Sequence, residues 1–403
     1  MSDVLRDIFE RSVRSRIFKD RKVLLPDYVP DELPHREEQI KKLGAILAPV
    51  LRGERPSNVF IYGLTGTGKT AVTKFVIRNL MEYGKKIGLF SKVRFASAYV
   101  NCRQDDTTYR VIYRFSEEIG CKLPFTGLST AEAYRRLMRF IDRLGLMVIV
   151  ILDEIDFLVR KRGDELLYRL TRANDELRRG KISIVGITNK INFIDTLDAR
   201  VRSSLSEEEL VFPPYNAIQL EDILRSRAKL AFHEGAIDEG VISLCASLAA
   251  KEHGDARKAL DLLRVASEIA EREGAPKVTI KHVHMARAEI EKDRVTEVVK
   301  TLPLHSKIVL LAITQIYEGT TGEIYNRYKV LCRAAGLDPV TQRRVSDIIS
   351  ELDMIGLVNA KVVSRGRYGK TRITTLNVPK HTVLTVLSED MRLASLIKGY
   401  RYR

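Results

Sequence analysis

Short apolar runs alternate with segments of helical periodicity through the first half of the chain. The runs predict strands at 59–62, 93–101, 147–152, 181–189 and 209–212. Between them apolar residues recur every three or four positions, as in helices that cover a sheet, and one such helix is predicted from Gly163 to Arg178. The run Met147–Leu152 is apolar throughout, which is typical of a strand buried on both faces. This alternation predicts a right-handed, three-layer α/β domain with a parallel sheet.

The strand signal ends at the Pro213-Pro214 pair. Beyond it, an all-α lid is predicted, with helices at Ile218–Phe232, Asp238–Lys251, Asp255–Glu273 and Ile280–Lys292. Asp255 is predicted to be the N-cap of its helix. Arg257 then falls in the first turn, where a cation opposes the helix dipole. Its charge is therefore expected to have a partner, such as a bound phosphate, although an ordinary surface arginine is the alternative.

Residues 300–403 return to a mixed pattern. Helices are predicted at Pro303–Tyr317, Thr321–Ala335 and Val340–Ile355, with strands at Leu357–Val363 and Thr371–Asn377. Asp338 is predicted to be the N-cap of the third helix and Pro339 its first residue. Three helices followed by a β-hairpin predict a winged helix-turn-helix. Such units bind DNA, and they also serve as protein-binding modules.

The third of these helices has its apolar residues on one side, at Val345, Ile348, Ile349 and Leu352. Its exposed first turns would enter the major groove, and the residues predicted to read bases there are Gln342, Arg343, Arg344 and Ser346. The hairpin is basic and would contact phosphates or reach a minor groove. Its predicted DNA-binding residues are Arg365, Arg367, Tyr368, Lys370 and Arg372.

The net charge of the chain indicates which kind of molecule it binds. Its 403 residues carry a net charge of +16, and residues 300–403 hold 17 Lys and Arg against 8 Asp and Glu. This surplus predicts a polyanionic partner, above all double-stranded DNA, with a diffuse basic surface as the alternative. Four cysteines without a C-x-x-C pair predict free thiols, and the apolar runs are too short to span a bilayer. We expect a cytoplasmic, nucleoid-associated protein with no membrane partner.

The segment Gly63-Leu64-Thr65-Gly66-Thr67-Gly68-Lys69-Thr70 lies between a predicted strand and a predicted helix. It matches the phosphate-loop pattern G-x-x-x-x-G-K-[ST]. Its glycines permit positive φ, which lets backbone N–H groups turn toward phosphates. Lys69 would reach the β- and γ-phosphates, and the Thr70 hydroxyl would ligate Mg²⁺. We predict a site for a nucleoside triphosphate and Mg²⁺, with loop contacts from Thr65, Gly66, Thr67, Gly68, Lys69, Thr70 and Ala71.

Two acids follow the buried strand 147–152. Asp153 and Glu154 fall at its carboxyl end, where open α/β sheets place ligands. Asp153 is predicted to hold Mg²⁺ with Thr70, and Glu154 to orient or deprotonate an attacking water. Asn189 ends a later strand and is placed to hydrogen-bond the γ-phosphate or that water, with a plain turn residue as the alternative. These residues predict hydrolysis of the bound nucleoside triphosphate.

The patterns divide the chain into four parts. They predict a basic arm at 1–16, a nucleotide-binding domain at 17–213, the lid at 214–293 and the winged helix at 300–403. Within the nucleotide-binding domain, about 105–129 adds a helix and a basic-apolar loop that interrupt the simple alternation. This stretch is predicted to be an insertion.

These segments, in this order, resemble AAA+ ATPases, and more narrowly the archaeal replication initiators of the origin recognition complex / cell division control protein 6 family. The resemblance covers essentially the whole chain. It rests on residues 34–38, 63–70, 152–156, 188–189, 197–204 and 254–259 and on the winged helix. Leu64 and Thr65 stand where a generic AAA+ loop often has prolines, a departure that leaves the backbone contacts to phosphate intact.

The resemblance implies roles that spacing does not establish. Asn189 would be sensor 1, Arg257 sensor 2 from the lid, and Arg200 (or else Arg202) the arginine that acts on a neighbouring subunit's nucleotide. Residues expected beside the nucleotide are Tyr28, Val29, Pro30, His35, Arg36 and Tyr215. The insertion would make a second DNA contact, for which we single out Lys122, Phe125 and Thr126.

The hypothesis is a replication initiator that binds origin DNA, hydrolyses ATP slowly and helps to recruit or load the replicative helicase, alongside other initiator subunits. ATP or ADP would set the angle of the lid and thereby how DNA is held. The alternatives are an AAA+ clamp-loader or helicase-type motor, a DNA-binding regulator with structural ADP, and a transcription regulator with an ATPase switch.

Overall fold

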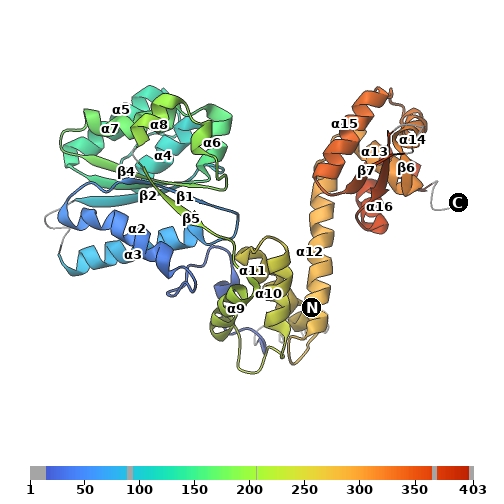
Figure 1. Cartoon of the computed structure of the whole chain (residues 1–403), viewed down its shortest axis with the longest axis horizontal. Helices are drawn as coiled ribbons and strands as arrows, with labels where there is room; N and C mark the ends of the chain where they lie inside the picture. Colours follow the sequence, from blue (N-terminus) through green and yellow to red (C-terminus); the bar gives the residue numbers. More distant parts are fainter. Residues whose placement is uncertain (1–14, 89–93, 206, 365–369, 399–403) are drawn as a thin grey trace, which may run out of the picture. The chain divides into compact units, whose positions relative to one another are not determined.

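The computed structural model describes residues 15–88, 94–205, 207–364 and 370–398 (Figure 1). The chain forms two compact units, 1–283 and 284–403, which divide within the helix α12 (Ile280–Thr301). Each unit has its own apolar core. Among the described residues, none of the helices is both long and apolar enough to cross a membrane. The four cysteines are buried and have free thiols, as predicted.

A parallel sheet forms the centre of the first unit (Figure 1). In the described part of the chain its strands are β1 (Asn58–Gly63), β2 (Phe95–Asn101), β3 (Met147–Asp153), β4 (Lys181–Thr188) and β5 (Glu207–Phe212). They lie in the order β2-β3-β4-β1-β5, and every neighbouring pair is parallel. β1 and β3 are buried along their whole length, which explains their unbroken apolar sequences. The predicted parallel-sheet architecture is confirmed.

Helices cover both faces of this sheet. One face packs against α2 (Glu37–Leu47) and α3 (Lys69–Lys86), and the other against α4 (Thr108–Glu118), α5 (Thr130–Leu144), α6 (Ile155–Arg162), α7 (Glu165–Glu176) and α8 (Ala199–Leu205). Because strand side chains alternate, Val59 and Ile61 enter the first core and Phe60 and Tyr62 the second. Short 3₁₀ helices lie at η1 (Arg21–Leu24), η2 (Ala48–Arg52) and η4 (Ile194–Thr196).

The prediction of one helix from Gly163 to Arg178 is wrong. The chain forms α6 directly after Glu154, stops at Gly163 and starts again as α7. Gly163 has a φ of 79°, a left-handed conformation that ends a right-handed helix. Its N–H group donates to the Val159 carbonyl oxygen at 2.8 Å. Gly163 therefore separates two helices, α6 and α7, whereas the sequence pattern had placed it at the start of a single helix.

The lid consists of α9 (Ala217–Ala231), α10 (Val241–Lys251), α11 (Ala256–Arg272) and the first part of α12. The predicted all-α character is confirmed, while α12 continues past the predicted end at Lys292 to Thr301. Asp255 caps α11 as predicted, because its Oδ1 atom accepts the N–H groups of Arg257 and Lys258.

The first described residues of the chain pack against the lid. The N–H groups of Lys19 and Asp20 donate to the Ala231 carbonyl oxygen at 2.8 and 3.1 Å. The rings of Phe18 and Phe232 pack in a tilted arrangement with centroids 5.3 Å apart, and Ile17 is buried. Residues 1–14 of the predicted arm lie outside the described residues.

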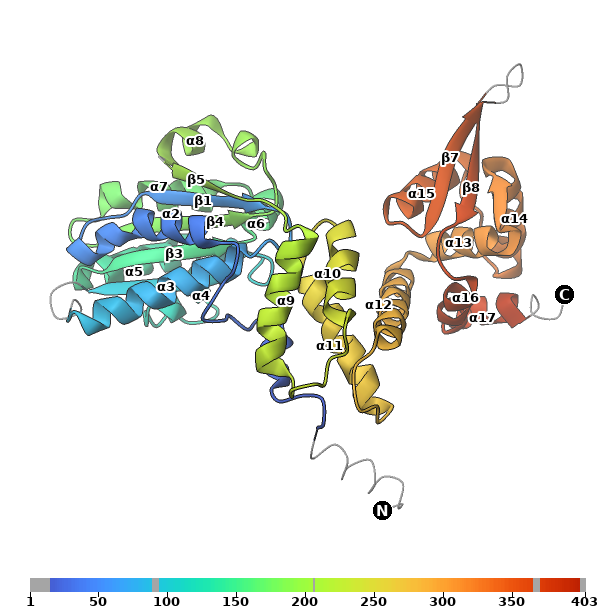
Figure 2. The ribbon, with the colours of Figure 1, turned by 60° about the horizontal axis from the view of Figure 1, so that its bottom comes forward.

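The second unit is a winged helix-turn-helix, as predicted (Figure 2). Its described elements are α13 (Leu304–Ile316), β6 (Glu318–Thr320), α14 (Thr321–Ala334), α15 (Gln342–Met354), β7 (Val358–Ser364), β8 (Lys370–Leu376), α16 (Lys380–Ser388) and α17 (Met391–Lys398). The three strands form an antiparallel sheet in the order β6-β8-β7. α15 buries the four apolar residues that the sequence pattern placed on its inner face.

The predicted start of α15 is wrong by three residues. Its N-cap is Thr341, whose hydroxyl oxygen accepts the Arg344 N–H at 3.3 Å, and its first residue is Gln342. The turn before it is held by other bonds, in which Leu337 N–H donates to the Cys332 carbonyl and Val340 N–H to the Tyr328 hydroxyl. Because those bonds keep residues 337–340 out of the helix, Asp338 has no capping role.

Candidate functional site

The sheet order brings three strand ends together in the first unit. β4 lies between β1 and β3, so the loop after Gly63, Asn189 after β4 and Asp153 at the end of β3 share one edge of the sheet. The registers place Tyr62 beside Thr188 and Asp153 beside Ile187. This is the carboxyl edge, where open parallel sheets bind ligands.

The loop between β1 and α3 needs its glycines for two reasons. Gly66 and Gly68 have φ of 73° and 89°, which disfavour residues with a Cβ atom. A Cβ atom on Gly66 would also lie 1.7 Å from Asp255 Oδ1, and one on Gly68 would lie 2.8 Å from the Tyr215 hydroxyl. The Ala256 N–H donates to the Gly66 carbonyl at 3.1 Å. The start of the lid helix α11 therefore lies directly against the loop.

Lys69 lies under the loop, with its Nζ atom donating to three oxygens. They are the Gly63 and Leu64 carbonyls at 2.8 and 2.7 Å and Asn189 Oδ1 at 2.9 Å. The pKa of Lys69 is lowered to about 8, chiefly by burial and in smaller part by repulsion from Arg257, while the charge of Asp153 opposes the shift. Two cations from different elements thus face the same space, which is an arrangement that favours an anion between them.

Asp153 accepts three hydrogen bonds on the acidic side of the site. Its Oδ2 atom accepts the Thr70 and Tyr99 hydroxyls, both at 2.8 Å, and its Oδ1 atom accepts the Glu154 N–H at 3.0 Å. Glu154 has a φ of 55° and forms the left-handed start of α6. Such backbone strain in a residue with a side chain is found mainly at functional positions.

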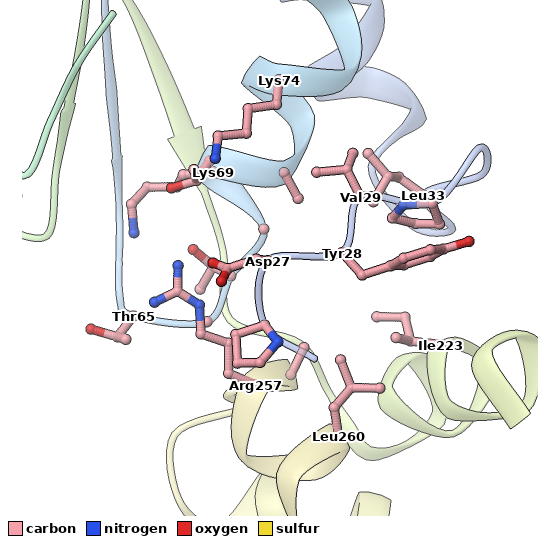
Figure 3. Close-up of a pocket in the computed structure, with 18 of the residues that line it drawn as sticks. Asp27, Tyr28, Val29, Leu33, Thr65, Lys69, Lys74, Ile223, Arg257 and Leu260 are labelled. Carbon is pink, nitrogen blue, oxygen red and sulfur yellow. The ribbon is translucent and has the colours of Figure 1, made fainter. Parts of the chain in front are cut away.

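A cavity of about 260 Å³ opens between the loop, the lid and the segment 25–34 (Figure 3). Lys69, Thr65 and Arg257 lie at one end, while Tyr28, Leu33, Ile223 and Leu260 lie at the other. The predicted residues that line it are Tyr28, Val29, Pro30, the seven residues from Thr65 to Ala71, Asp153, Glu154, Asn189, Tyr215 and Arg257. One polar end and one apolar end fit a nucleotide, and the Thr70–Asp153 oxygen pair fits Mg²⁺.

His35 and Arg36 are not part of that lining. The His35 Nε2 atom lies 2.8 Å from Asp222 Oδ2 on the lid. Arg36 is buried over the Tyr215 ring, where its Nε donates to the Thr67 carbonyl at 2.9 Å and its Nη2 to the Pro213 carbonyl at 2.7 Å. Burial lowers the pKa of Arg36. Arg36 therefore contacts the backbone of the phosphate loop from behind.

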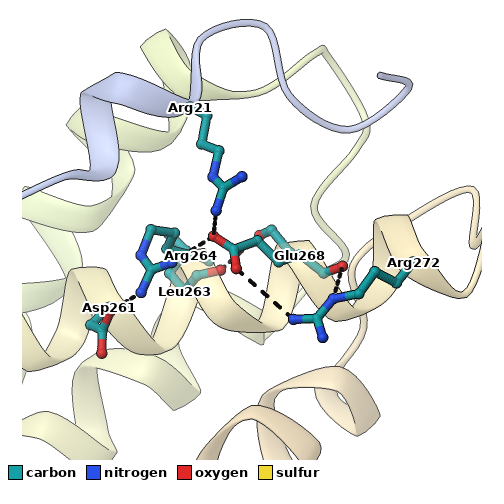
Figure 4. A network of polar contacts seen from close by, with 7 residues as sticks. Arg21, Asp261, Leu263, Arg264, Glu268 and Arg272 are labelled. Atoms are coloured by element: carbon teal, nitrogen blue, oxygen red, sulfur yellow. Dashed lines mark hydrogen bonds and ion pairs between the residues drawn. The ribbon is translucent and has the colours of Figure 1, made fainter. Parts of the chain in front are cut away.

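The apolar wall around Tyr28 is attached to the lid. Arg227 on α9 donates to the Val23 and Tyr28 carbonyls, both at 3.3 Å, and its guanidinium lies 4.7 Å from the centre of the Tyr28 ring. Further along, Glu268 on α11 pairs with Arg21, Arg264 and Arg272 (Figure 4). Because both contacts come from lid helices, a movement of the lid would also move the segment that carries Tyr28.

Sequence reasoning missed several residues that line the cavity. They are chiefly Lys74, Tyr99, Asn101, Ile223, Arg227 and Leu260. The signal for Tyr99 and Asn101 was available, because they end the strand beside β3 and so share its carboxyl edge. Lys74 follows Thr70 by four residues on α3, one helical turn away on the same face. The lid residues carry no comparable signal.

Arg200 lies away from this cavity, in α8. Its side chain is 79% exposed and pairs with Asp198 at 3.1 Å. The Asp198 partner raises the pKa of Arg200, so the guanidinium stays charged. The role of Arg200 toward a neighbouring subunit stays a prediction.

The predicted DNA-reading residues on α15 are exposed at Gln342, Arg343 and Arg344 and partly buried at Ser346. Arg344 pairs with Glu351 at 3.0 Å. Arg372 on β8 turns back onto α15, where its Nη1 donates to the Ser350 hydroxyl at 2.8 Å and the Ser346 carbonyl at 3.3 Å. Arg365, Arg367 and Tyr368 lie outside the described residues, as does the Lys370 side chain.

The predicted insertion contains α4 and an exposed loop. Lys122, Phe125 and Thr126 are all exposed. The loop is anchored to α4, because the Tyr109 hydroxyl donates to the Pro124 carbonyl at 2.6 Å and the Phe125 ring meets the Tyr113 ring edge-on at 5.2 Å. The three residues therefore lie on an exposed loop that is held in place by contacts with α4.

Comparison with known proteins places these sites in a family. Three family models match the chain: an AAA domain at 52–192, a Cdc6 AAA+ ATPase-type lid domain at 221–288 and a CDC6 C-terminal winged helix domain at 297–386. An ORC1-type DNA replication protein of Sulfurisphaera tokodaii is 58% identical, over 98% of this chain and 99% of its own length. The chain belongs to the ORC1-type DNA replication protein family.

A second ORC1-type protein is similar to this chain over nearly its whole length. The Aeropyrum pernix protein of that name is 54% identical over 98% of this chain and all of its own. A solved structure of the Aeropyrum pernix ORC1 protein in complex with DNA superposes with a TM-score of 0.82 and 55% identity, covering 95% of this chain and 100% of that one. Membership confirms the AAA+ fold with its lid and winged helix.

Proposed function

We propose that this protein is an ATP-dependent replication initiator that binds double-stranded origin DNA and helps to recruit or load the replicative helicase. The observation that carries the proposal is the cavity in which the phosphate loop, the Thr70–Asp153 pair and the lid arginine Arg257 meet. Family membership and the DNA-bound relative support the DNA part. Other initiator subunits on the same DNA are proposed as further partners.

ATP would lie with its phosphates in the loop and its base against Tyr28, Ile223 and Leu260. The Lys69 ammonium would exchange its present carbonyl and Asn189 partners for phosphate oxygens. Thr70 and Asp153 would hold Mg²⁺. The metal supplies positive charge that neutralises the β- and γ-phosphates.

Hydrolysis would use the residues that surround the γ-phosphate position. Glu154, at the left-handed start of α6, would accept the proton of the attacking water. Asn189 would orient that water or bind the γ-phosphate, and Arg257 would stabilise the developing charge from the lid. Arg200 would do the same for a neighbouring subunit. We propose slow turnover, in which ATP and ADP act as two states of a switch.

The contact between the lid and the phosphate loop would couple the nucleotide state to the position of the lid. Asp255 and Ala256 lie against Gly66, so a change in the partner of Arg257 acts at the base of α11. Loss of the γ-phosphate would remove that partner and shift the lid. On this proposal, the nucleotide state alters how the protein grips DNA.

DNA would be held through two surfaces. The exposed start of α15 would read bases in the major groove, and the wing would contact phosphates. The loop with Lys122, Phe125 and Thr126 would add a second contact. Because many of these contacts would be electrostatic, affinity should fall steeply as salt rises.

Competition binding at physiological salt tests this proposal. The native protein should prefer origin DNA to random duplex, and the combined variant Gln342→Ala, Arg343→Ala, Arg344→Ala should lose that preference. A matched variant, Lys85→Ala and Lys86→Ala at the exposed end of α3, removes charge elsewhere and should keep it. Equal affinity of the native protein for both DNAs would overturn the proposal.

A further inference from the structure

Two hydroxyl groups converge on a single oxygen of Asp153. Thr70 on α3 and Tyr99 on β2 each donate to Asp153 Oδ2 at 2.8 Å. The other carboxylate oxygen, Oδ1, accepts the Glu154 N–H. The carboxylate therefore has three donors, from the phosphate loop helix, the neighbouring strand and the following residue. No role was predicted for Tyr99 from the sequence.

The position of Tyr99 beside Asp153 follows from the pairing of strands β2 and β3. Tyr99 pairs with Ile151 in the β2–β3 register, two residues before Asp153 on the same strand. The Lys74 ammonium lies 4.2 Å from the centre of its ring, and both side chains line the cavity. Burial and the charge of Asp153 raise the pKa of the Tyr99 hydroxyl.

Without Tyr99, the Asp153 carboxylate would keep two donors, the Thr70 hydroxyl on Oδ2 and the Glu154 N–H on Oδ1. The terminal torsion of an aspartate side chain is broad, with shallow minima. The Thr70 hydroxyl has one proton, and in the proposed site its oxygen also faces the metal. The Tyr99 hydroxyl is a second donor on Oδ2, comes from the neighbouring strand, and restricts the rotation of the carboxylate further. Groups that orient a metal ligand in this way commonly change metal affinity by about 10- to 100-fold when they are lost.

We propose that Tyr99 is a positioning residue for the metal, whose hydroxyl holds the Asp153 carboxylate in the orientation that binds Mg²⁺ together with Thr70. The inference rests on the proposed nucleotide site and extends it to a residue outside the phosphate loop and the acid pair. Tyr99 does not touch the reacting phosphate in this scheme. Its effect is confined to the part of nucleotide affinity that depends on the metal.

The test measures equilibrium ATP binding to the full chain, once with Mg²⁺ and once with EDTA, and takes the ratio of the two affinities. Tyr99→Phe removes the hydroxyl and keeps the ring. Tyr134→Phe is the matched control, because Tyr134 is a buried tyrosine on α5 whose hydroxyl donates to the Arg169 carbonyl at 2.9 Å. Asp153→Asn tests the metal site itself. Thermal unfolding without nucleotide is recorded for every variant.

Tyr99→Phe is expected to lower the Mg²⁺-dependent ratio by about tenfold, with unchanged binding in EDTA and an unfolding midpoint like that of Tyr134→Phe. Asp153→Asn should abolish the ratio, and Tyr134→Phe should keep it. If Asp153→Asn abolishes the ratio and Tyr99→Phe keeps it, Tyr99 has no positioning role. An equal loss of binding in EDTA by Tyr99→Phe also overturns the inference, since that result indicates general disruption. A native ratio in Asp153→Asn would instead overturn the proposed metal site.

Discussion

Gly66 of the phosphate loop touches Asp255 of the lid so closely that a Cβ atom on Gly66 would lie 1.7 Å from the Asp255 Oδ1 atom. The same aspartate caps α11 by accepting the Arg257 N–H at 2.9 Å. One short contact thus joins the loop that would hold the phosphates to the helix that carries Arg257. On the proposed function, this contact would couple the nucleotide state to the position of the lid.

Gly66→Ala should separate the lid from the loop. The new methyl group meets Asp255, and a residue with a Cβ atom at a φ of 73° costs about 1–2 kcal/mol in addition. We expect ATP affinity to fall by more than about tenfold, measured with a fluorescent ATP analogue. Gly44→Ala on α2 is the control, because nothing lies within 4 Å of its Cβ position. Native affinity in Gly66→Ala would contradict the described contact.

Lys69 should give the nucleotide-free protein a distinctive pH dependence. Burial lowers its pKa from 10.5 to about 8 in the folded state. Between these values the unfolded chain binds the proton more strongly, so the penalty for burying Lys69 falls as pH rises. The free energy of unfolding of the native protein should thus increase relative to Lys69→Met from about pH 8 to about pH 10.

Denaturant unfolding at those two pH values measures this difference. Lys85→Met, at an exposed position of the same helix, is the control for loss of a lysine and should show no such trend relative to the native protein. A native-minus-Lys69→Met difference that stays constant or shrinks with rising pH would show that Lys69 is not buried as described.

Two arginines of the winged helix should have separable effects. Arg343 is exposed at the start of α15, so Arg343→Ala should weaken specific DNA binding by about 1–3 kcal/mol and leave stability unchanged. Arg372 bonds to Ser346 and Ser350, so Arg372→Met should lower the free energy of unfolding by about 1 kcal/mol. Gel-shift titration and denaturant unfolding of both variants measure these effects. The reverse assignment, with Arg343 needed only for stability, would be inconsistent with its exposure.

Glu268 should stabilise the N-terminal segment on the lid. Its side chain is 14% exposed and pairs with three arginines, so Glu268→Ala leaves several cations close together without their shared partner. We expect a loss of about 1–2 kcal/mol in denaturant unfolding. Glu165→Ala breaks an exposed pair with Arg169 and should cost about 0.5 kcal/mol or less. Equal effects of the two substitutions would exclude a special role for the network.

The parts of the fold that depend on local pattern were predictable. The apolar run at 147–152 identified a buried strand, and the acids after it led to Asp153 and Glu154 at the cavity. The phosphate loop was recognisable because its glycines adopt positive φ, a conformation that residues with a Cβ atom rarely adopt. The α15 face followed in the same way from helical spacing.

The missing parts depend on contacts distant in sequence. Tyr99 and Asp153 meet only because β2 pairs with β3, and Arg227 reaches Tyr28 across about two hundred residues of chain. The family resemblance placed Arg36 beside the nucleotide, whereas its side chain donates to the Thr67 and Pro213 carbonyls. Thr341 replaced Asp338 as a cap because Tyr328, in another helix, holds the preceding turn.

The most direct test of the account is a footprint of the full chain on candidate origin DNA and on random duplex at physiological salt, with Mg²⁺ and either ATP or ADP. We predict protection of a defined segment of origin DNA, preferred over random duplex, whose extent or strength differs between the two nucleotides. Indiscriminate binding with the same protection in ATP and ADP would contradict both origin recognition and the nucleotide switch.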